Sequence, residues 1–194
     1  YRNLKNAPRA LEYLNKSLDL RRAINDQRGI ASALNNIASC HQDANDYAAS
    51  TKYLLQALNI MQTLGDQHAI AGAYSNLANS YKHENKPTKS IEYYQEAIHL
   101  FAQLGNAEGL TIANANIGMQ YCDLKRYDKA LPHLEASYEH AQATGSLNLQ
   151  QVAAKRLADG YEQIGNYEQA LHYQQLSATL NDSLFNAQSA EKLA

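Results

Sequence analysis

The sequence repeats itself with a step of forty residues, and this period limits the fold more than any other feature. The second halves of the units begin at five positions, Ala7, Tyr47, Pro87, Tyr127 and Tyr167. The first halves begin at Asp26, Asp66, Asn106 and Ser146. No insertion interrupts the step. The sequence therefore predicts a partial unit at 1–25 and four whole units at 26–65, 66–105, 106–145 and 146–185. We expect the partial unit to start at the end of a helix whose beginning lies upstream.

Each unit predicts two helices. The first half opens on Asp, Asn or Ser, whose side chains can accept hydrogen bonds from the free N–H groups at a helix start. The second half ends near a glycine in three units, which suits a left-handed helix terminus. Apolar residues recur at helical spacing between these signals. Small residues recur where two helices must approach closely, at Ala38, Ala78, Gly118 and Ala158. Pro132 stands early in its helix and predicts either a tilt or a delayed start there.

Several segments carry a recognisable motif. The stretches "NLANSY", "NIGMQY" and "RLADGY", and the later pattern Tyr-x-x-Ala-Leu at 127–131 and 167–171, resemble the tetratricopeptide repeat. The resemblance covers residues 1–182. It departs from the family because the aromatic position early in the first helix holds no Trp, and because the Pro that usually ends the second helix is missing. The forty-residue unit is similar to that of bacterial peptide receptors and animal scaffold proteins.

This resemblance implies an all-α, right-handed superhelical solenoid of antiparallel helix pairs, whose first helices line a concave side. The groove-facing stripe that it implies has four positions in each unit: Ser32, Asn35, Ser39, Gln42; Gly72, Ser75, Asn79, Lys82; Ile112, Ala115, Met119, Cys122; Val152, Lys155, Asp159, Glu162. Candidate peptide-binding residues among them are Asn35, Asn79, Lys82, Met119 and Lys155.

A column of polar residues flanks this stripe: Asn36, Asn76, Asn116 and Arg156. Asn is a poor helix former, so its recurrence needs a reason. An amide offers donors and an acceptor that suit the backbone of an extended peptide, and an arginine can hold a carboxylate with two hydrogen bonds. Related repeat proteins use an Asn at the matching place to hold peptides. Two structural alternatives stand beside this one: the amides bridge neighbouring first helices, and Arg156 pairs with Asp159 or with another neighbouring residue.

Composition and motifs exclude other functions. The net charge of −2 gives no basic surface for nucleic acid, and no apolar run is long enough to span a membrane. Two cysteines, 82 residues apart, form neither a disulfide framework nor a metal motif. No nucleophile triad, phosphate loop or zinc motif occurs. The sequence therefore predicts no enzyme activity, no catalytic residue, no metal and no cofactor, and the partners expected are proteins or peptides. The repeated tyrosines are interpreted as packing residues.

After Leu180 the repeat pattern fades, and residues 183–194 predict a capping or connecting helix. A capping helix would place Leu184, Phe185 and Leu193 over the last repeat. The segment resembles the one that follows the repeats in sensor histidine kinases and transcriptional regulators of Bacteroidetes-type bacteria. That resemblance implies a sensing part of a larger signalling protein, with a periplasmic location; without it a cytoplasmic one is expected. Three functions stay open: a peptide-binding module, a scaffold that self-associates through the solenoid ends, and a regulatory domain of an attached kinase or DNA-binding domain.

Overall fold

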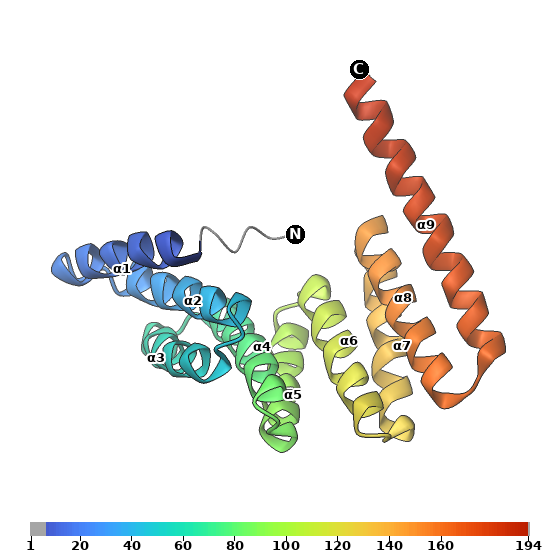
Figure 1. Cartoon of the computed structure of the whole chain (residues 1–194), viewed down its shortest axis with the longest axis horizontal. Coiled ribbons are helices and arrows are strands. Elements are labelled where there is room, and N and C mark those ends of the chain that lie inside the picture. The colour runs from blue at the N-terminus through green and yellow to red at the C-terminus, as the bar shows by residue number, and fades with distance from the viewer. Residues whose placement is uncertain (1–6, 194) are drawn as a thin grey trace. The chain divides into compact units, whose positions relative to one another are not determined.

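The computed structural model describes residues 7–193, and this range is helical with short turns and no strand (Figure 1). The helices are α1 (Ala7–Ala23), α2 (Gln27–Asp43), α3 (Tyr47–Leu64), α4 (Gln67–His83), α5 (Pro87–Gln103), α6 (Ala107–Asp123), α7 (Tyr127–Ala143), α8 (Leu147–Ile164) and α9 (Tyr167–Leu193). First and second helices of the forty-residue units alternate along the chain. The predicted all-α class is thereby confirmed.

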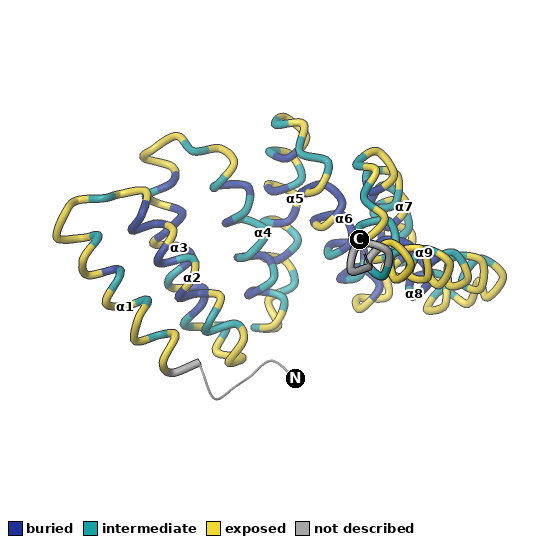
Figure 2. The backbone as a smooth tube through the Cα atoms, turned by 90° about the horizontal axis from the view of Figure 1, so that it is seen from above, coloured by how far each residue is buried: buried dark blue, intermediate teal, exposed yellow. Residues whose placement is uncertain are grey.

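The chain divides into two compact units, residues 1–100 and residues 101–194. In the N-terminal unit α1 packs on α2, α2 on α3, and α3 on α4. In the C-terminal unit α6 packs on α7, α7 on α8, and α8 on α9, while α6 also contacts α8. Buried residues lie on the facing sides of these helices, and exposed residues lie on their outer sides and in the turns (Figure 2).

Large and small residues alternate in the core, as close helix packing requires. In the N-terminal unit the side chains of Leu34, Ile37, Leu54 and Leu77 are almost completely buried. The small residues Ala38, Ala57 and Ala78 have no exposed surface, because the neighbouring helix lies directly against them. The repeated small positions of the sequence are therefore helix-contact positions.

The helix boundaries follow the predicted capping residues. Asp26, Asp66, Asn106 and Ser146 each accept a hydrogen bond from the backbone N–H three residues on, at the start of α2, α4, α6 and α8. Each turn also contains a residue with a left-handed backbone. These residues are Asn25, Asn45, Gly65, Asn85, Gly105, Lys125, Gly145 and Gly165.

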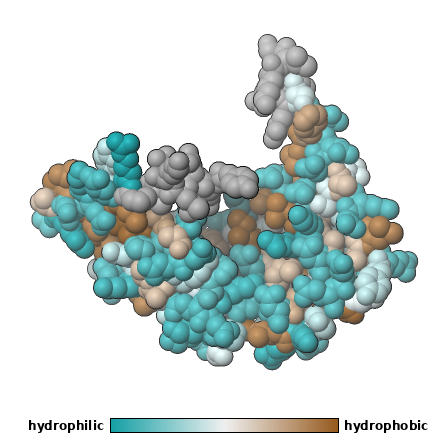
Figure 3. Space-filling view, viewed as in Figure 1, coloured by the Kyte–Doolittle hydropathy of each residue, from teal (hydrophilic) through white to brown (hydrophobic). Residues whose placement is uncertain are grey.

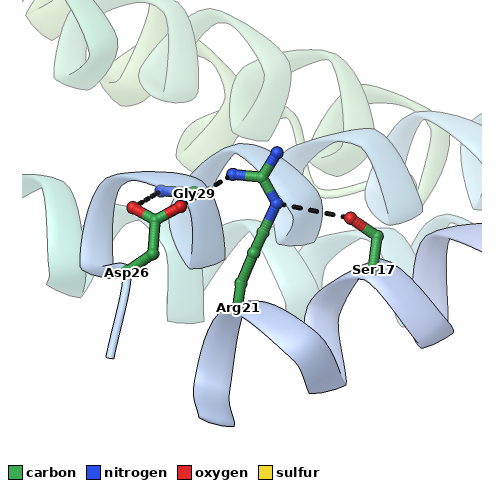
Figure 4. A network of polar contacts seen from close by, with 4 residues as sticks. All are labelled: Ser17, Arg21, Asp26 and Gly29. Carbon is green, nitrogen blue, oxygen red and sulfur yellow. Dashed lines mark hydrogen bonds and ion pairs between the residues drawn. The ribbon is translucent and has the colours of Figure 1, made fainter. Parts of the chain in front are cut away.

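A polar network fixes the turn between α1 and α2 (Figure 4). Arg21 of α1 donates from Nη1 to Asp26 Oδ2 at 3.0 Å and from Nε to Ser17 Oγ at 3.3 Å. The other oxygen of Asp26 accepts from the backbone N–H of Gly29 at 2.9 Å. A Cβ at Gly29 would lie 1.8 Å from Arg21 Nη1, so a glycine at this position leaves room for the guanidinium.

Each whole repeat joins its two helices through a stacked ring pair. The aromatic residue at the end of the first helix stacks on an aromatic residue of the second helix, with ring centroids 5.4–5.8 Å apart. The pairs are His41–Tyr53, Tyr81–Tyr93, Tyr121–His133 and Tyr161–Tyr173. Offset stacking of this kind adds to the energy of apolar burial. The interpretation of the repeated tyrosines as packing residues therefore holds for these positions.

Pro132 lies inside α7, which begins at Tyr127 without delay. The start of this helix lacks a side-chain cap, since Arg126 stands at the cap position and makes no capping hydrogen bond. Pro132 is the sixth residue of α7, and it leaves the carbonyl of Asp128 without its usual intrahelical donor. The predicted delayed start is wrong, because the proline is close enough to the first turn to be accommodated.

Residues 183–193 continue α9 instead of forming a separate helix; Ala194 lies outside the described residues. α9 has 27 residues and its antiparallel partner α8 has 18, so the last turns of α9 extend beyond α8 (Figure 1). Phe185 is 69% exposed there. The expected packing of Phe185 over the last repeat is therefore wrong. The side chain of Leu193 lies outside the described residues.

Candidate functional site

A groove of about 330 Å³ runs between α2 and α4 in the N-terminal unit. The end of α3 forms its floor through Met61 and Leu64. Its walls are polar or small: Arg28, Ala31, Ser32, Asn35, Asp66, Ala69, Gly72, Ala73 and Asn76. Two of the predicted peptide-binding residues, Asn35 and Asn76, thus face each other across one groove.

These two amides are hydrogen-bonded. Asn76 Nδ2 donates to Asn35 Oδ1 at 3.1 Å, which links α4 to α2. The amide nitrogen of Asn35 and the amide oxygen of Asn76 make no hydrogen bond within residues 7–193. Asn76 therefore bridges two first helices, as the structural alternative predicts, and the pair still offers one donor and one acceptor to a guest.

Gln42 does not face this groove. Its Nε2 donates to the backbone oxygen of Asn76 at 3.2 Å and to Ser80 Oγ at 2.8 Å. It therefore lies between α2 and α4, and its expected place on the groove stripe is wrong. The amide spans a gap that an apolar side chain of this length would leave with unpaired polar groups.

The matching groove of the C-terminal unit lies between α6 and α8 and has a volume of about 80 Å³. It is lined by Thr111, Ile112, Ala115, Asn116, Ser137, Leu149, Val152, Ala153 and Arg156. Ile112 and Val152 stand where Ser32 and Gly72 stand in the N-terminal unit, and each is nearly half exposed. These branched side chains make the second groove smaller and more apolar.

Arg156 is exposed at the edge of this groove. The expected ion pair with Asp159 is not formed, and no other hydrogen bond or ion pair involves Arg156 among the described residues. Its guanidinium is therefore available to a carboxylate. Asn116 is half-buried beside it.

The other predicted site residues are distributed differently. Asn36 is exposed, while Asn79, Lys82 and Met119 are half-buried; none of these four lines either groove. Lys155 is exposed and lies in a different groove, between α8 and α9.

Cys122 was expected on the groove stripe and is instead 1% exposed. Its Sγ would lie 3.8 Å from a Cβ placed at Gly160 of α8. The thiol is a small apolar group and fills the interface between α6 and α8, at the register position that Gln42 occupies in the N-terminal unit.

The groove between α8 and α9 is the largest of these, with a volume of about 490 Å³, and the sequence analysis did not find it. The available signal was the loss of apolar residues from α9. Gln174 and Asn181 stand in register with Leu54 and Met61, which are buried in the N-terminal unit. A change from apolar to polar at such positions marks a helix face that no further repeat of the same kind covers.

Two further findings concern the described residues as a whole. None of the helices between residues 7 and 193 combines the length and apolar character needed to cross a bilayer. No group of three or more His, Cys, Asp or Glu within the described part of the chain is placed to hold a metal ion.

Comparison with known families decides what kind of repeat this is. The family model of the tetratricopeptide repeat matches residues 1–63, 29–103 and 109–183. The chain belongs to the tetratricopeptide repeat family. A comparison with the curated proteins finds no sequence that matches it.

Solved structures of other repeat proteins share the fold. The apo form of RapI superposes with a TM-score of 0.80 at 17% identity, over 92% of this chain and 50% of that one. A putative kinesin light chain repeat protein from Podosopora anserina has a TM-score of 0.76 at 14% identity, over 94% of this chain and 90% of that one. A Rap protein in complex with Competence and Sporulation Factor has a TM-score of 0.67 at 17% identity, over 94% of this chain and 60% of that one. Identities this low establish the fold alone.

Proposed function

We propose that this tetratricopeptide repeat chain binds an extended peptide, or an extended segment of a protein, in the grooves between its first helices. The observation that carries the proposal is the Asn35–Asn76 pair, which is held by one hydrogen bond and keeps one amide donor and one acceptor unused inside a groove of about 330 Å³. A peptide backbone presents a matching acceptor and donor at each residue.

The N-terminal groove suits a peptide backbone rather than a particular side chain. Ser32 and Gly72 leave its walls low, so a main chain can approach the amides. The hydrogen bond between Asn35 and Asn76 holds both side chains in place before binding, which reduces the entropy lost on association.

The C-terminal groove suits an apolar side chain followed by a carboxylate. Ile112 and Val152 provide the apolar walls, and Arg156 stands at the edge with no competing partner in the described residues. A guanidinium holds a carboxylate with two parallel hydrogen bonds. The carboxylate is either a peptide C-terminus or an acidic side chain.

Two considerations support peptide recognition over the alternatives. A Rap protein of the same fold is recorded in complex with Competence and Sporulation Factor, which supports ligand recognition as the role of this chain. The polar residues Gln174 and Asn181 on the last helix disfavour self-association through an apolar end of the C-terminal unit. We infer that the module is non-enzymatic. Its place in a larger sensor or regulator rests on the resemblance of the segment after Leu180.

The test uses a displayed library of random peptides of about ten residues, which reach about 33–36 Å when fully extended. We expect the selected peptides to share an apolar residue next to a carboxylate. Replacing Asn76→Ala together with Asn116→Ala should abolish their binding, while circular dichroism and the melting temperature stay nearly unchanged. If the double variant unfolds, the amides belong to the framework and the proposal fails.

Arg156→Gln tests the contribution of the C-terminal groove separately from that of the N-terminal groove. It should weaken peptides that carry the carboxylate by at least about tenfold, the loss expected for a charge-assisted pair, and leave amidated peptides without it unaffected. Arg126→Gln is the matched control, since Arg126 is exposed in the same unit and lines neither groove. Equal losses in both variants would show that binding depends only on net charge.

A further inference from the structure

The groove between α8 and α9, called the end groove from here on, occupies the position in which a further helix would pack. Four of its lining residues are Lys155, Glu162, Ala170 and Leu171. Their register equivalents, three repeats earlier, are Asn35, Gln42, Ser50 and Thr51. The two sets can be compared position by position, because the forty-residue step has no insertion.

In the N-terminal unit three of these equivalents contact α4, and the fourth contacts Glu84, the residue that follows its last turn. Asn35 accepts from Asn76, and Gln42 donates to Asn76 and Ser80. The hydroxyl of Ser50 lies 3.1 Å from that of Ser80, and Thr51 donates to Glu84. The residues that line the end groove therefore correspond to residues that contact the next first helix in the N-terminal unit. On the last helix pair they form the surface on which such a helix would pack.

The same correspondence holds within the C-terminal unit, where the equivalent residues lie one repeat earlier. A Cβ at Gly160 of α8 would lie 2.3 Å from Leu134 of α7 and 3.8 Å from Cys122 of α6, so α8 sits directly on these two residues. Their equivalents forty residues on are Gln174 and Glu162, and both line the end groove.

No turn interrupts α9 at the register position where the chain turns after each earlier second helix, so no following helix among the described residues covers the end groove there. Every earlier second helix is followed by a residue with a left-handed backbone, and the next helix begins two residues after it. These residues are Asn25, Gly65, Gly105 and Gly145. Phe185 stands at the equivalent position, and α9 continues through it to Leu193. Tyr167 and Leu171, at the start of α9, are 71% and 55% exposed. On the face of the molecule shown in Figure 3, hydrophobic residues lie in separate groups among hydrophilic ones.

The charged residues that line the end groove determine which helix can bind there. Glu162 replaces Gln42, so this position can only accept hydrogen bonds, whereas the glutamine donates. Lys155 replaces Asn35, so that position can only donate, whereas the asparagine accepts. Neither residue, nor Asp159 between them, forms an ion pair within the described part of the chain. An incoming helix must therefore present an acceptor to Lys155 and a donor to Glu162.

The spacing of these groups follows from α4. Asn35 and Gln42 meet α4 at Asn76 and Ser80, four residues apart. Thr51 meets Glu84, which follows the last turn of α4 and stands four residues after Ser80. Leu171 replaces Thr51, so an apolar residue is required at this third position.

We propose that the end groove binds an amphipathic helix of a partner protein that carries an acidic residue, a basic residue four positions later and an apolar residue four positions after that. The acidic residue meets Lys155, the basic residue meets Glu162 and Asp159, and the apolar residue packs on Leu171. Gln174 and Asn181 exclude a helix whose whole contact face is apolar. This site is separate from the grooves between first helices.

The probe is an alanine-rich, capped peptide of about 20 residues, long enough to be helical, with Glu, Lys and Leu at the three spaced positions and a fluorescent label. We expect saturable binding by fluorescence anisotropy that weakens as salt is added. Glu162→Lys and Lys155→Glu should each weaken it by about tenfold or more, as for paired interface charges. A peptide with Glu and Lys exchanged should bind the double variant Lys155→Glu/Glu162→Lys and not the original chain.

Glu139→Lys is the matched control, because Glu139 is exposed on α7 and lines none of the grooves described. It should leave binding unchanged, and circular dichroism should show all variants folded. Failure of the probe to bind, or failure of the exchanged peptide to rescue the double variant, would overturn the proposal. A dimer of the chain that Glu162→Lys dissociates would also overturn it, since a second copy would then occupy the groove.

Discussion

Lys125 has a backbone conformation that its side chain disfavours. Its φ is 57°, whereas the equivalent turn positions hold Asn45, Asn85 and Gly165. Glycine adopts the left-handed region readily because it has no Cβ to approach the neighbouring carbonyl oxygen, and asparagine tolerates it because its short polar side chain can hydrogen-bond to the nearby backbone. The turn between α6 and α7 therefore stores strain that the other turns of this kind avoid.

Replacing Lys125→Gly should raise the free energy of unfolding by about 0.5–1 kcal/mol, the relief of the left-handed strain less the added freedom of the unfolded chain. Chemical denaturation measures the change. Asn85→Gly is the control and should give a smaller gain, since asparagine already tolerates the conformation. A loss of stability on Lys125→Gly would show that the lysine side chain makes a compensating contact.

His133 is half-buried, and its ring is fixed by a hydrogen bond and a stacking contact. Asn114 Nδ2 donates to the carbonyl of Leu110 at 3.0 Å, which leaves Asn114 Oδ1 to accept from Nδ1–H of His133 at 2.8 Å. The ring also stacks on Tyr121, and burial lowers the pKa of His133 below its ordinary value. Protonation therefore costs more in the folded state than in the unfolded chain.

This pKa shift predicts a pH dependence of stability. With the folded pKa below the unfolded value of about 6.5, the contribution is complete above that pH and is lost as the pH falls from there towards the folded pKa. His133→Tyr keeps a stacking ring, as Tyr93 and Tyr173 do in register, and removes the titration. Its unfolding free energy should fall less between neutral and mildly acidic pH than that of the original chain. An unchanged slope would exclude His133 as the source; His68→Tyr, on an exposed residue, is the control.

At the scale of helices, one residue decides how closely α6, α7 and α8 approach. Leu134 of α7 is completely buried between two glycines. A Cβ at Gly118 would lie 2.7 Å from its Cγ, and a Cβ at Gly160 would lie 2.3 Å from its Cδ1. Both distances are below any normal contact, so a methyl group at either position would force Leu134 to move from its buried place. The helical backbone at these two positions does not itself demand glycine.

Gly160→Ala should therefore destabilise the chain by about 1–3 kcal/mol through overpacking. In a Leu134→Ala background the same change should cost less, because the truncated side chain leaves room for the new methyl group. The difference, measured as a double-mutant cycle of unfolding free energies, reports the contact directly. Equal costs in both backgrounds would show that Leu134 is not the obstacle.

At the scale of the whole chain, the sequence predicts the helices well because each signal recurs once per unit. The caps Asp26, Asp66 and Asn106, and the termini at Gly65 and Gly105, appear in the structure where the pattern places them. Each signal acts within a few residues, so local chemistry is enough to find it.

The candidate site was less predictable, because it depends on neighbouring helices. Gln42 and Cys122 share a register position, yet one spans α2 and α4 through hydrogen bonds and the other fills an apolar contact. Helical spacing cannot separate a residue that faces a groove from one that faces the next helix, since the two directions differ by about one residue of rotation. The continuation of α9 was likewise hidden, because Phe185 suits both a capping contact and an exposed surface.

The uninterrupted forty-residue step has a consequence for how such chains change length. Because each helix pair closes with a left-handed residue and reopens on a capping side chain, a crossover between two copies of this junction would add or remove one complete module in frame. Such a chain lengthens by duplication without the need for a new turn sequence. The helix beside Phe185 has neither the left-handed residue nor the capping side chain, so a crossover there would not join two complete modules.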